Sequence, residues 1–351
     1  MAAARPPRYP SAMPRDDITG RVPADPAAPD ALAEGRALLP PADARRVALW
    51  GIGLALGGSA VLSVNDMAVK ALSGEYPLHQ VVLIRALIGM AGLVLGLALT
   101  RGLGGLRPSL LTRRPGMHAL RVLCVLLSNV TYFLGLAALP LADGVAIFYV
   151  APLLIVALSV PLLHERVGWR RWAAVAVGLG GVAVMLRPGA GATTWPAVLV
   201  LLSALFYALM HILTRRMAPS ESAFSMAFWT QGGFITLSLL MGLSVGDGQL
   251  AQGAGPSLAF LLRAWTWPPL ADWPLFLATG VTVTLGGLML AQAYRTCPPS
   301  IIAPFEYAGM PMAVLWGAVA FGTWPDALAW AGIAMIVGAG LYALWREAAR
   351  K

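Results

Sequence analysis

The chain has 351 residues, of which 58% are hydrophobic and only 12% are charged, and its mean hydropathy is +0.72. A water-soluble domain has no way to bury so much apolar surface, so the composition excludes a soluble globular protein. The apolar residues also fall into blocks of about 20, the length that crosses a bilayer core as a helix. The sequence therefore predicts an all-α, polytopic membrane protein surrounded by membrane lipid.

The net charge of +9 and the pI of about 10.1 are typical of nucleic-acid-binding proteins. Here, however, the arginines lie in short loops between apolar blocks, where they orient helices. We therefore expect no nucleic-acid partner. Cys124, Cys297 and four scattered histidines form neither a disulfide framework nor a metal cluster, so we predict no cofactor and no metal.

Residues 1–44 are rich in Pro and Ala and contain no apolar run, which predicts a disordered cytoplasmic tail without a signal peptide. Between the later helices, residues 245–272 carry three tryptophans that suit the membrane interface, which predicts a short helix on the outer surface or a lid over the entrance. Ten spanning helices are predicted, near 47–71, 77–100, 117–139, 143–163, 169–187, 195–215, 223–244, 273–294, 300–321 and 327–346.

Basic residues set the predicted orientation. If the chain starts in the cytoplasm, most arginines of the loops and ends face that side, and the opposite side receives only Lys70, Arg187 and Arg263. The positive-inside rule then places both termini in the cytoplasm and predicts a multi-pass protein of the cell inner membrane.

Two stretches, 141–187 and 300–346, repeat one pattern of two apolar segments with a proline inside the first. Superposing Pro152 on Pro311 also superposes Gly181 on Gly340 and Arg187 on Arg346. We therefore predict two halves, 45–190 and 191–351. Five spans per half is an odd number, so the halves have opposite orientations, as in the inverted repeats of secondary transporters.

Ionisable residues inside the bilayer cost roughly 2.5–3.5 kcal/mol each on insertion scales, so they mark candidate site residues. Arg85 lies about nine residues into the second predicted helix. It is predicted to face a water-filled cavity and bind an anionic substrate group; the alternative is a structural pair with Asp66 or a backbone carbonyl.

Glu306 lies between Pro304 and Pro311 in the ninth predicted helix, beside Tyr307. A carboxyl group at this depth is a candidate for coupling substrate movement to protons. The alternative is a structural carboxylate that the dipole of the helix N-terminus stabilises.

Asp66 precedes Lys70 by four residues, so it is a candidate for substrate contact and also for an ordinary ion pair along the helix. Asn65 and His211 occupy matching positions in the first and sixth helices and are predicted to supply hydrogen bonds at the cavity wall. Gln231 matches Arg85, which predicts an asymmetric site.

Tyr149 and Tyr307 are predicted to form aromatic walls for a planar or cationic ligand. Pro152 and Pro311 interrupt corresponding helices of the two halves, which is where transporters of this kind bind their substrates. Six glycines of the apolar blocks are predicted to mark close helix contacts: Gly92, Gly96, Gly178, Gly181, Gly338 and Gly340.

The arrangement resembles the EamA-type branch of the drug/metabolite transporter superfamily over residues 47–346. An HER-like turn after the fourth helix and glycine-rich fifth and tenth helices carry the resemblance, which implies a 5+5 inverted repeat, a central cavity and no ATP site. Where the family has a second glutamate to match Glu165, this chain has Trp324, so we expect a structural role for Glu165. The stretches concerned are LPLADGVAIFYVAPLLIVALSVPLLHERVGWRRWAAVAVGLGGVAVM and APFEYAGMPMAVLWGAVAFGTWPDALAWAGIAMIVGAGLY.

We therefore predict a secondary transporter, monomeric or homodimeric, that moves a small organic metabolite such as an amino acid, vitamin, amine or drug-like molecule by alternating access. It is not predicted to be an enzyme, because the sequence contains no P-loop, HExxH or GxSxG motif. The alternative is a membrane-embedded lipid-modifying enzyme, which requires a cluster of intramembrane His, Asp or Glu near one face.

Overall fold

The computed structural model describes residues 41–101, 112, 114–164, 168–186 and 194–348. Within these ranges the chain forms α-helices and short 3-10 helices and no strand, so the all-α prediction is confirmed. The tail up to residue 40 and Glu165 lie outside the described residues.

The helices follow the apolar blocks and end where turn residues or prolines interrupt them. Ser222, for example, caps one helix start by accepting a hydrogen bond from the backbone N–H of Ser225, and His164 ends another helix in the left-handed conformation. The elements are α2 Pro41–Leu72, α3 Leu78–Arg101, α5 Pro115–Ala138, α6 Leu141–Phe148, α7 Ala151–Leu163, α8 Trp169–Leu186, α9 Thr194–Met217, α10 Ala223–Val245, η2 Gln249–Ala251, α11 Pro256–Leu262, η3 Leu270–Asp272, α12 Trp273–Thr296, α13 Pro299–Ile302, η4 Ala303–Ala308, α14 Gly309–Phe321 and α15 Ala327–Ala348.

Seven helical segments of the described chain are long and apolar enough to cross a membrane, and two shorter apolar helices, Phe305–Phe321 and Ala327–Ala339, accompany them. Large apolar side chains are exposed along these helices, as at Leu243, which is 86% exposed. Such a surface suits lipid and not water. The polytopic membrane class is therefore established, whereas the ten-span repeat stays a prediction.

The fourth and ninth predicted helices are not continuous, contrary to the prediction of single helices at 143–163 and 300–321. α6 ends at Phe148 and α7 begins at Ala151, with Pro152 in its first turn. In the ninth, the 3-10 helix η4 separates α13 from α14, and Pro311 lies in the first turn of α14. Proline has no backbone N–H and its ring clashes with the carbonyl four residues earlier, so Pro152 and Pro311 fit the first turn of a helix, where that hydrogen bond is not made.

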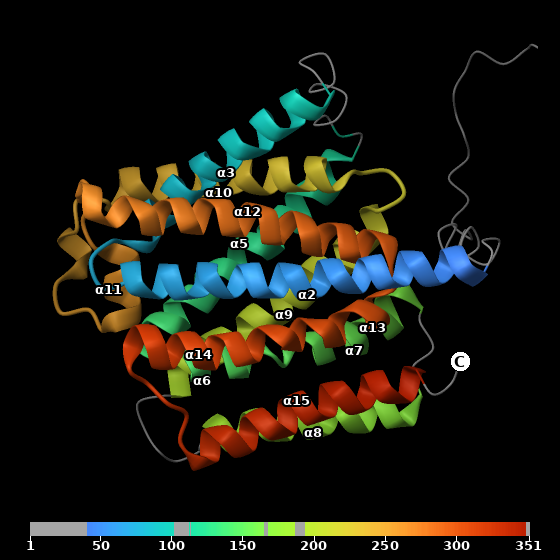
Figure 1. The fold of residues 1–351 in the computed structure, drawn as a ribbon. Coiled ribbons are helices and arrows are strands. Elements are labelled where there is room, and N and C mark those ends of the chain that lie inside the picture. The colour runs from blue at the N-terminus through green and yellow to red at the C-terminus, as the bar shows by residue number, and fades with distance from the viewer. Residues whose placement is uncertain (1–40, 102–111, 113, 165–167, 187–193, 349–351) are drawn as a thin grey trace, which may run out of the picture. The chain divides into compact units, whose positions relative to one another are not determined.

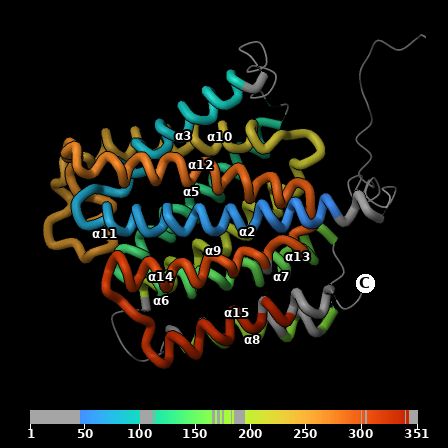
Figure 2. The backbone as a smooth tube through the Cα atoms, in the orientation of Figure 1, coloured from blue at the N-terminus to red at the C-terminus, as the bar shows by residue number. Residues whose placement is uncertain are grey.

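Helices far apart in the sequence pack in pairs (Figures 1 and 2). α2 packs along α12, α5 along α9, α3 along α10, and α8 along α15 at the lower edge of the view. Each pair joins one helix from before residue 190 to one from after it. α14 also lies on α2, and α7 on α9. The two predicted halves are therefore interleaved and share one interior.

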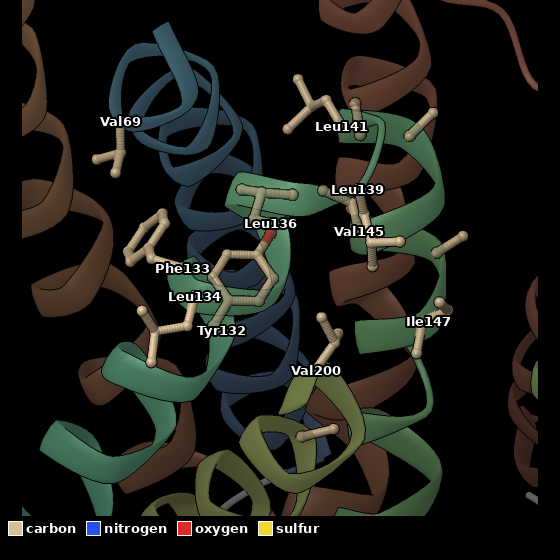
Figure 3. Close-up of a cluster of buried hydrophobic side chains, with 14 of the residues drawn as sticks. Val69, Tyr132, Phe133, Leu134, Leu136, Leu139, Leu141, Val145, Ile147 and Val200 are labelled. Carbon is tan, nitrogen blue, oxygen red and sulfur yellow. The ribbon is translucent and has the colours of Figure 1, made fainter. Parts of the chain in front are cut away.

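The largest buried cluster extends through the bundle, and part of it lies where α5, α6 and α9 meet (Figure 3). Tyr132, Phe133 and Leu136 of α5 interdigitate there with Val145 of α6 and Val200 of α9. Close approach of α9 depends on Gly135, because a Cβ at this position would lie 2.6 Å from both the Pro196 carbonyl oxygen and Val200 Cγ2. Such close packing is the main source of helix association inside a bilayer.

The segment between α10 and α12 contains the short helix predicted for it, α11. Two hydrogen bonds attach the residues after α11 to the first half of the chain. Arg263 Nη1 donates to the Ser73 carbonyl, in the turn between α2 and α3, at 3.1 Å, and the Thr266 N–H donates to Gln80 Oε1, in the first turn of α3, at 3.2 Å. The Trp265 ring stacks on His79 with a centroid separation of 5.8 Å.

The glycines of the α8–α15 contact yield a first test. A Cβ at Gly181 would lie 2.9 Å from the Gly332 carbonyl oxygen and 2.9 Å from Met335 Cβ, whereas one at Gly338 would meet no atom within 4 Å. Gly338 therefore does not lie at a close contact, contrary to its prediction, and serves as the matched control.

Gly181→Val is expected to destabilise the protein by about 1–3 kcal/mol through overpacking. Gly338→Val is expected to change stability by much less, since both variants share the same modest helix-propensity effect. Thermal unfolding of the two purified variants in detergent measures the difference. Equal loss in both would show that α8 and α15 do not pack through Gly181.

Candidate functional site

Two adjoining cavities lie inside the helical bundle. The first, which we call the tyrosine chamber, has a volume of about 130 Å³ and is lined by Asp66, Tyr132, Tyr149, Tyr207 and Glu306 among others. The second, the arginine chamber, has a volume of about 170 Å³ and is lined by Arg121, Asn129, His211, Gln231 and Thr284 among others. They share the walls formed by Leu62, Ser128, Tyr207 and Leu290, so the two cavities are neighbours.

Glu306 enters the tyrosine chamber from η4, the 3-10 stretch that interrupts the ninth predicted helix. Its side chain is buried, and both carboxylate oxygens accept hydrogen bonds from tyrosines of other helices. Tyr207 of α9 donates to Oε2 at 2.7 Å and Tyr294 of α12 donates to Oε1. The carboxyl group is thus held by two tyrosine donors, and it also lies in the first turn of η4.

Asp66 of α2 lines the same chamber. Tyr132 of α5 donates to Oδ2 at 2.9 Å, and the neighbouring Asn65 donates to Oδ1 at 3.2 Å. The alternative pairing with Lys70 is wrong: Lys70 Nζ donates instead to the Leu136 carbonyl at 2.6 Å and to a second carbonyl at the end of α5. Carbonyls at a helix C-terminus have no intrahelical partner and attract a cation.

Aromatic rings surround these carboxyl groups. Phe148 contacts Tyr132 and Tyr207, with centroid separations of 4.9 and 5.0 Å. Tyr149 contacts Tyr307 at 5.6 Å. Tyr149 faces the chamber, whereas Tyr307 is not among its described lining residues and lies behind Tyr149. Both helix interruptions therefore contribute directly to the chamber wall, through Tyr149 after α6 and Glu306 in η4.

The arginine chamber contains two of the predicted residues. Gln231 Nε2 donates to Thr284 Oγ1 at 2.7 Å. The His211 ring lies between Tyr207 and Tyr294, at centroid separations of 4.4 and 3.9 Å, and neither of its buried nitrogens has a hydrogen-bond partner in the structure. His211 therefore touches both tyrosines that hold Glu306.

Arg85 is fully buried but is absent from the described residues that line the two chambers. Its Nη2 donates to Asn129 Oδ1 at 2.6 Å, and its guanidinium lies between the rings of Phe133 and Phe234, 5.4 and 5.1 Å from their centroids. Asn129 and Phe234 line the arginine chamber, so Arg85 lies one layer behind its wall. No ion pair with Asp66 forms, which removes that alternative.

The sequence analysis missed Arg121, a second buried arginine that lines the arginine chamber directly. Its guanidinium donates to Thr214 Oγ1 at 2.8 Å and to Thr230 Oγ1 at 2.9 Å. The signal was available, because Arg121 interrupts the third apolar block as Arg85 interrupts the second. The role of Tyr132 had no such signal, since it depends on the contact between α2 and α5.

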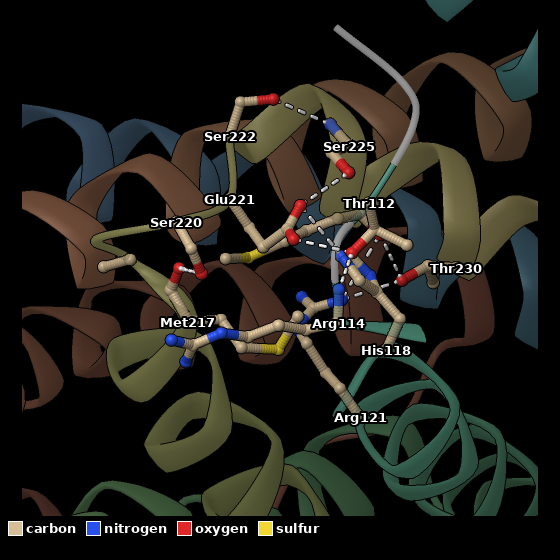
Figure 4. Close-up of polar contacts among 12 residues, drawn as sticks. Thr112, Arg114, His118, Arg121, Met217, Ser220, Glu221, Ser222, Ser225 and Thr230 are labelled. Carbon is tan, nitrogen blue, oxygen red and sulfur yellow. Dashed lines mark hydrogen bonds and ion pairs between the residues drawn. The ribbon is translucent and has the colours of Figure 1, made fainter. Parts of the chain in front are cut away.

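A polar cluster adjoins the chamber where α9 turns into α10 (Figure 4). Its centre is Glu221, which accepts from Thr112 Oγ1 at 2.6 Å and Ser225 Oγ at 3.1 Å, and lies 3.2 Å from His118 Nε2. The backbone carbonyl of Glu221 accepts from Arg295 Nε at 2.8 Å. The cluster thus ties the start of α5, the α9–α10 turn and the end of α12 together.

Known proteins are similar to this chain in sequence and in fold. A model of the EamA-like transporter family matches residues 49–187. The chain is 30% identical over 240 residues to a riboflavin transporter of Rhizobium johnstonii. The matched residues make up 68% of this chain and 74% of the relative. The chain belongs to the EamA-like transporter family.

Other members are similar over more of the chain. An S-adenosylmethionine uptake transporter of Rickettsia prowazekii is 23% identical over 305 residues, 87% of this chain and 96% of its own length. The pseudopaline exporter CntI of Pseudomonas aeruginosa is 28% identical over 293 residues, 82% and 93% of the two chains. A solved crystal structure that is 21% identical shares the fold, with a TM-score of 0.61 over 86% of this chain and 98% of that one.

These EamA-family relatives are named as transporters of small metabolites. The prediction of a transporter is therefore confirmed, and none of them supports the alternative of a lipid-modifying enzyme. The chambers supply the internal space that a carrier of small molecules requires.

The cluster around Glu221 leads to a pH-dependent test outside the membrane-spanning helices. Burial by itself raises the pKa of Glu221, but hydrogen bonds from Thr112 and Ser225 and the adjacent His118 imidazole outweigh it and hold the pKa below its ordinary value. A lowered folded-state pKa stabilises the fold above the unfolded-state pKa, and this stabilisation is lost as the pH falls through the folded-state value.

Glu221→Gln is therefore expected to lower the melting temperature in detergent at pH 7, and the difference from the unaltered protein is expected to shrink below about pH 4. The matched control is Glu75→Gln, because Glu75 is exposed. Melting curves recorded between about pH 3 and pH 8, a span that includes the titration of glutamates near pH 4, provide the measurement. A pH-independent difference would contradict the assignment.

Proposed function

We propose that this EamA-family protein is a secondary transporter that moves a small organic metabolite through the two chambers by alternating access. One observation carries the proposal: two carboxyl groups, on half-buried Asp66 and buried Glu306, face one cavity between the predicted halves, and each accepts a hydrogen bond from at least one tyrosine of another helix. Intramembrane carboxyl groups that face a cavity are typical of substrate and proton pathways.

The packing of the helices supports the inverted repeat. If the predicted halves exchange roles, α2 replaces α9 and α5 replaces α12, so the α2–α12 contact becomes the α9–α5 contact. The α3–α10 and α8–α15 contacts map onto themselves, and α14 on α2 becomes α7 on α9. An exchange of this kind lets inward-open and outward-open states have matching packing. The proposal includes ten spans, both termini in the cytoplasm and an inner-membrane location.

The chamber walls favour a substrate with a planar heteroaromatic ring and a polar tail. The rings of Phe148 and Tyr149 offer stacking surfaces, and the carboxyl groups accept hydrogen bonds or attract a cation. Two relatives are named for riboflavin and S-adenosylmethionine, and both molecules combine such a ring with a polar tail. We take these two compounds as the first probes.

The predicted residues receive distinct roles in this proposal. Glu306 and Asp66 bind polar groups of the substrate and exchange protons as their tyrosine donors move. The chain breaks before Pro152 and Pro311 supply the hinge points, because backbone interruptions can change conformation without breaking a continuous helix. The residues that complete or support the walls are Asn65, Arg85, Tyr149, His211, Gln231 and Tyr307.

Glu306→Gln and Asp66→Asn are each expected to lower the initial rate of uptake in proteoliposomes by about tenfold or more, because a hydrogen bond to a charged group contributes roughly 1.5–3 kcal/mol. The measurement follows labelled riboflavin and S-adenosylmethionine in parallel. Glu75→Gln is the control, since this exposed carboxylate is not among the described lining residues of either chamber. Unaltered uptake of a transported probe by both cavity variants would refute the carboxyl assignment.

Proton coupling has a separate readout. An imposed gradient with the acidic side outside is expected to accelerate uptake by the unaltered protein and to have little effect on Glu306→Gln. Both proteins are compared with and without an ionophore that abolishes the gradient. Equal acceleration of both would assign the coupling to another group.

A further inference from the structure

We infer that Arg121 binds a carboxylate of the transported molecule, so that the substrate is a zwitterion whose anionic end lies in the arginine chamber. This inference rests on the proposed function and adds the charge class of the substrate. It depends on three observations: the hydrogen bonds that hold the Arg121 guanidinium, its lack of a counter-ion among the described residues, and the position of the carboxyl groups of Asp66 and Glu306.

Three helices hold the Arg121 guanidinium in place. From α5 its Nε donates to Thr214 Oγ1 of α9, and its Nη1 donates to Thr230 Oγ1 of α10. Each threonine hydroxyl in turn donates to a carbonyl of its own helix, that of Met210 at 2.9 Å or Met226 at 2.8 Å. The hydroxyl protons are therefore used elsewhere, and the oxygens are free to accept from the arginine. Figure 4 shows Arg121 reaching Thr230 beside the Glu221 cluster.

One edge of the guanidinium lacks a strong acceptor. Its Nη2 contacts only a thioether among the described residues, with Met210 Sδ at 3.6 Å. Thioether sulfur is a weak acceptor, whereas a carboxylate accepts from the guanidinium edge through two parallel hydrogen bonds. Arg121 lines the arginine chamber, so a ligand in the chamber can supply this acceptor.

Arg121 also lacks a counter-ion within the part of the chain that the structure describes. The acidic–basic contact found there is that of His118 with Glu221, and no carboxylate lies within 4.0 Å of Arg121 or Arg85. Only 5% of Arg121 is exposed. A charge buried without an opposite partner is costly, and an anion that arrives with the substrate removes this cost when the chamber is filled.

The second arginine strengthens the positive field on this side. Arg85 lies behind Asn129 and Phe234, both of which line the arginine chamber, and its Nε and Nη1 have no hydrogen-bond partner in the structure. The carboxyl groups of Asp66 and Glu306 lie instead in the tyrosine chamber, beyond the shared wall of Ser128 and Tyr207. Of the two adjoining cavities, one therefore carries carboxyl groups and the other an arginine.

This polarity matches a molecule with opposite charges at its two ends. A neutral substrate would leave Arg121 without a counter-ion, and a purely cationic one would be repelled from the arginine chamber. A zwitterion satisfies both ends, with its cationic or donor group near the carboxyl groups and its carboxylate on Arg121. Among the two proposed probes, S-adenosylmethionine carries a carboxylate together with cationic groups, an ammonium and a sulfonium, and riboflavin carries neither.

The test compares S-adenosylmethionine with its decarboxylated form, two probes that differ only in the carboxylate. In proteoliposomes the unaltered protein is expected to take up the carboxylate-bearing probe about tenfold or more faster at equal low concentration, the scale of a charge-assisted contact. Arg121→Met is expected to reduce this preference to about twofold, and Arg121→Lys to retain part of it, because lysine keeps the charge without the planar fork. Arg46→Met, at an exposed arginine of α2, is expected to keep the full preference.

If Arg121 has a purely structural role, Arg121→Met slows the uptake of both probes equally and leaves the ratio of their uptake rates unchanged. That result overturns the inference. Uptake of both probes at the same rate by the unaltered protein also overturns it, without any need for the variants to fold. Failure to take up S-adenosylmethionine, its decarboxylated form and riboflavin alike would instead refute the proposed function on which the inference rests. Melting temperatures of all variants are recorded beside the uptake rates.

Discussion

A carboxyl group buried among membrane-spanning helices needs hydrogen-bond donors from the protein, and the arrangement of this interior follows from that requirement. Glu306 receives donors from Tyr207 and Tyr294, on α9 and α12, and Asp66 receives one from Tyr132 on α5. Each of these bonds joins two elements of the same predicted half. They hold the helices around a cavity that close packing alone would fill.

The interruptions of two helices place these groups at the cavity. Regular helices satisfy their own backbone and present side chains at fixed intervals, so a continuous ninth helix would place Glu306 according to the helical repeat alone. The 3-10 stretch η4 and the break between α6 and α7 expose local backbone and turn Glu306 and Tyr149 inward. Non-helical backbone at such depth is tolerated only where protein or a cavity surrounds it. The breaks and the chambers therefore depend on each other.

Positive and negative side chains are separated within the interior. Arginines lie on one side of the shared wall and carboxyl groups on the other, and each is held mainly by neutral partners of the protein. Direct ion pairs between them would neutralise the cavity and leave a substrate little to bind. Because the groups are held apart, their charges remain available to a molecule that spans both chambers.

The sequence by itself determined the membrane class, the helical blocks and their approximate ends, because hydropathy and proline positions act locally along the chain. It also identified Asp66, Glu306, Gln231 and His211 as residues of the interior, since a polar group exposed to lipid is costly and is expected to face the protein interior. Only the tertiary structure decided their partners: Asp66 bonds Tyr132 and not Lys70, Arg85 lies behind the cavity wall, and Arg121 lines it. Hydrogen bonds between helices depend on rotation and register, which a pattern along one helix does not contain.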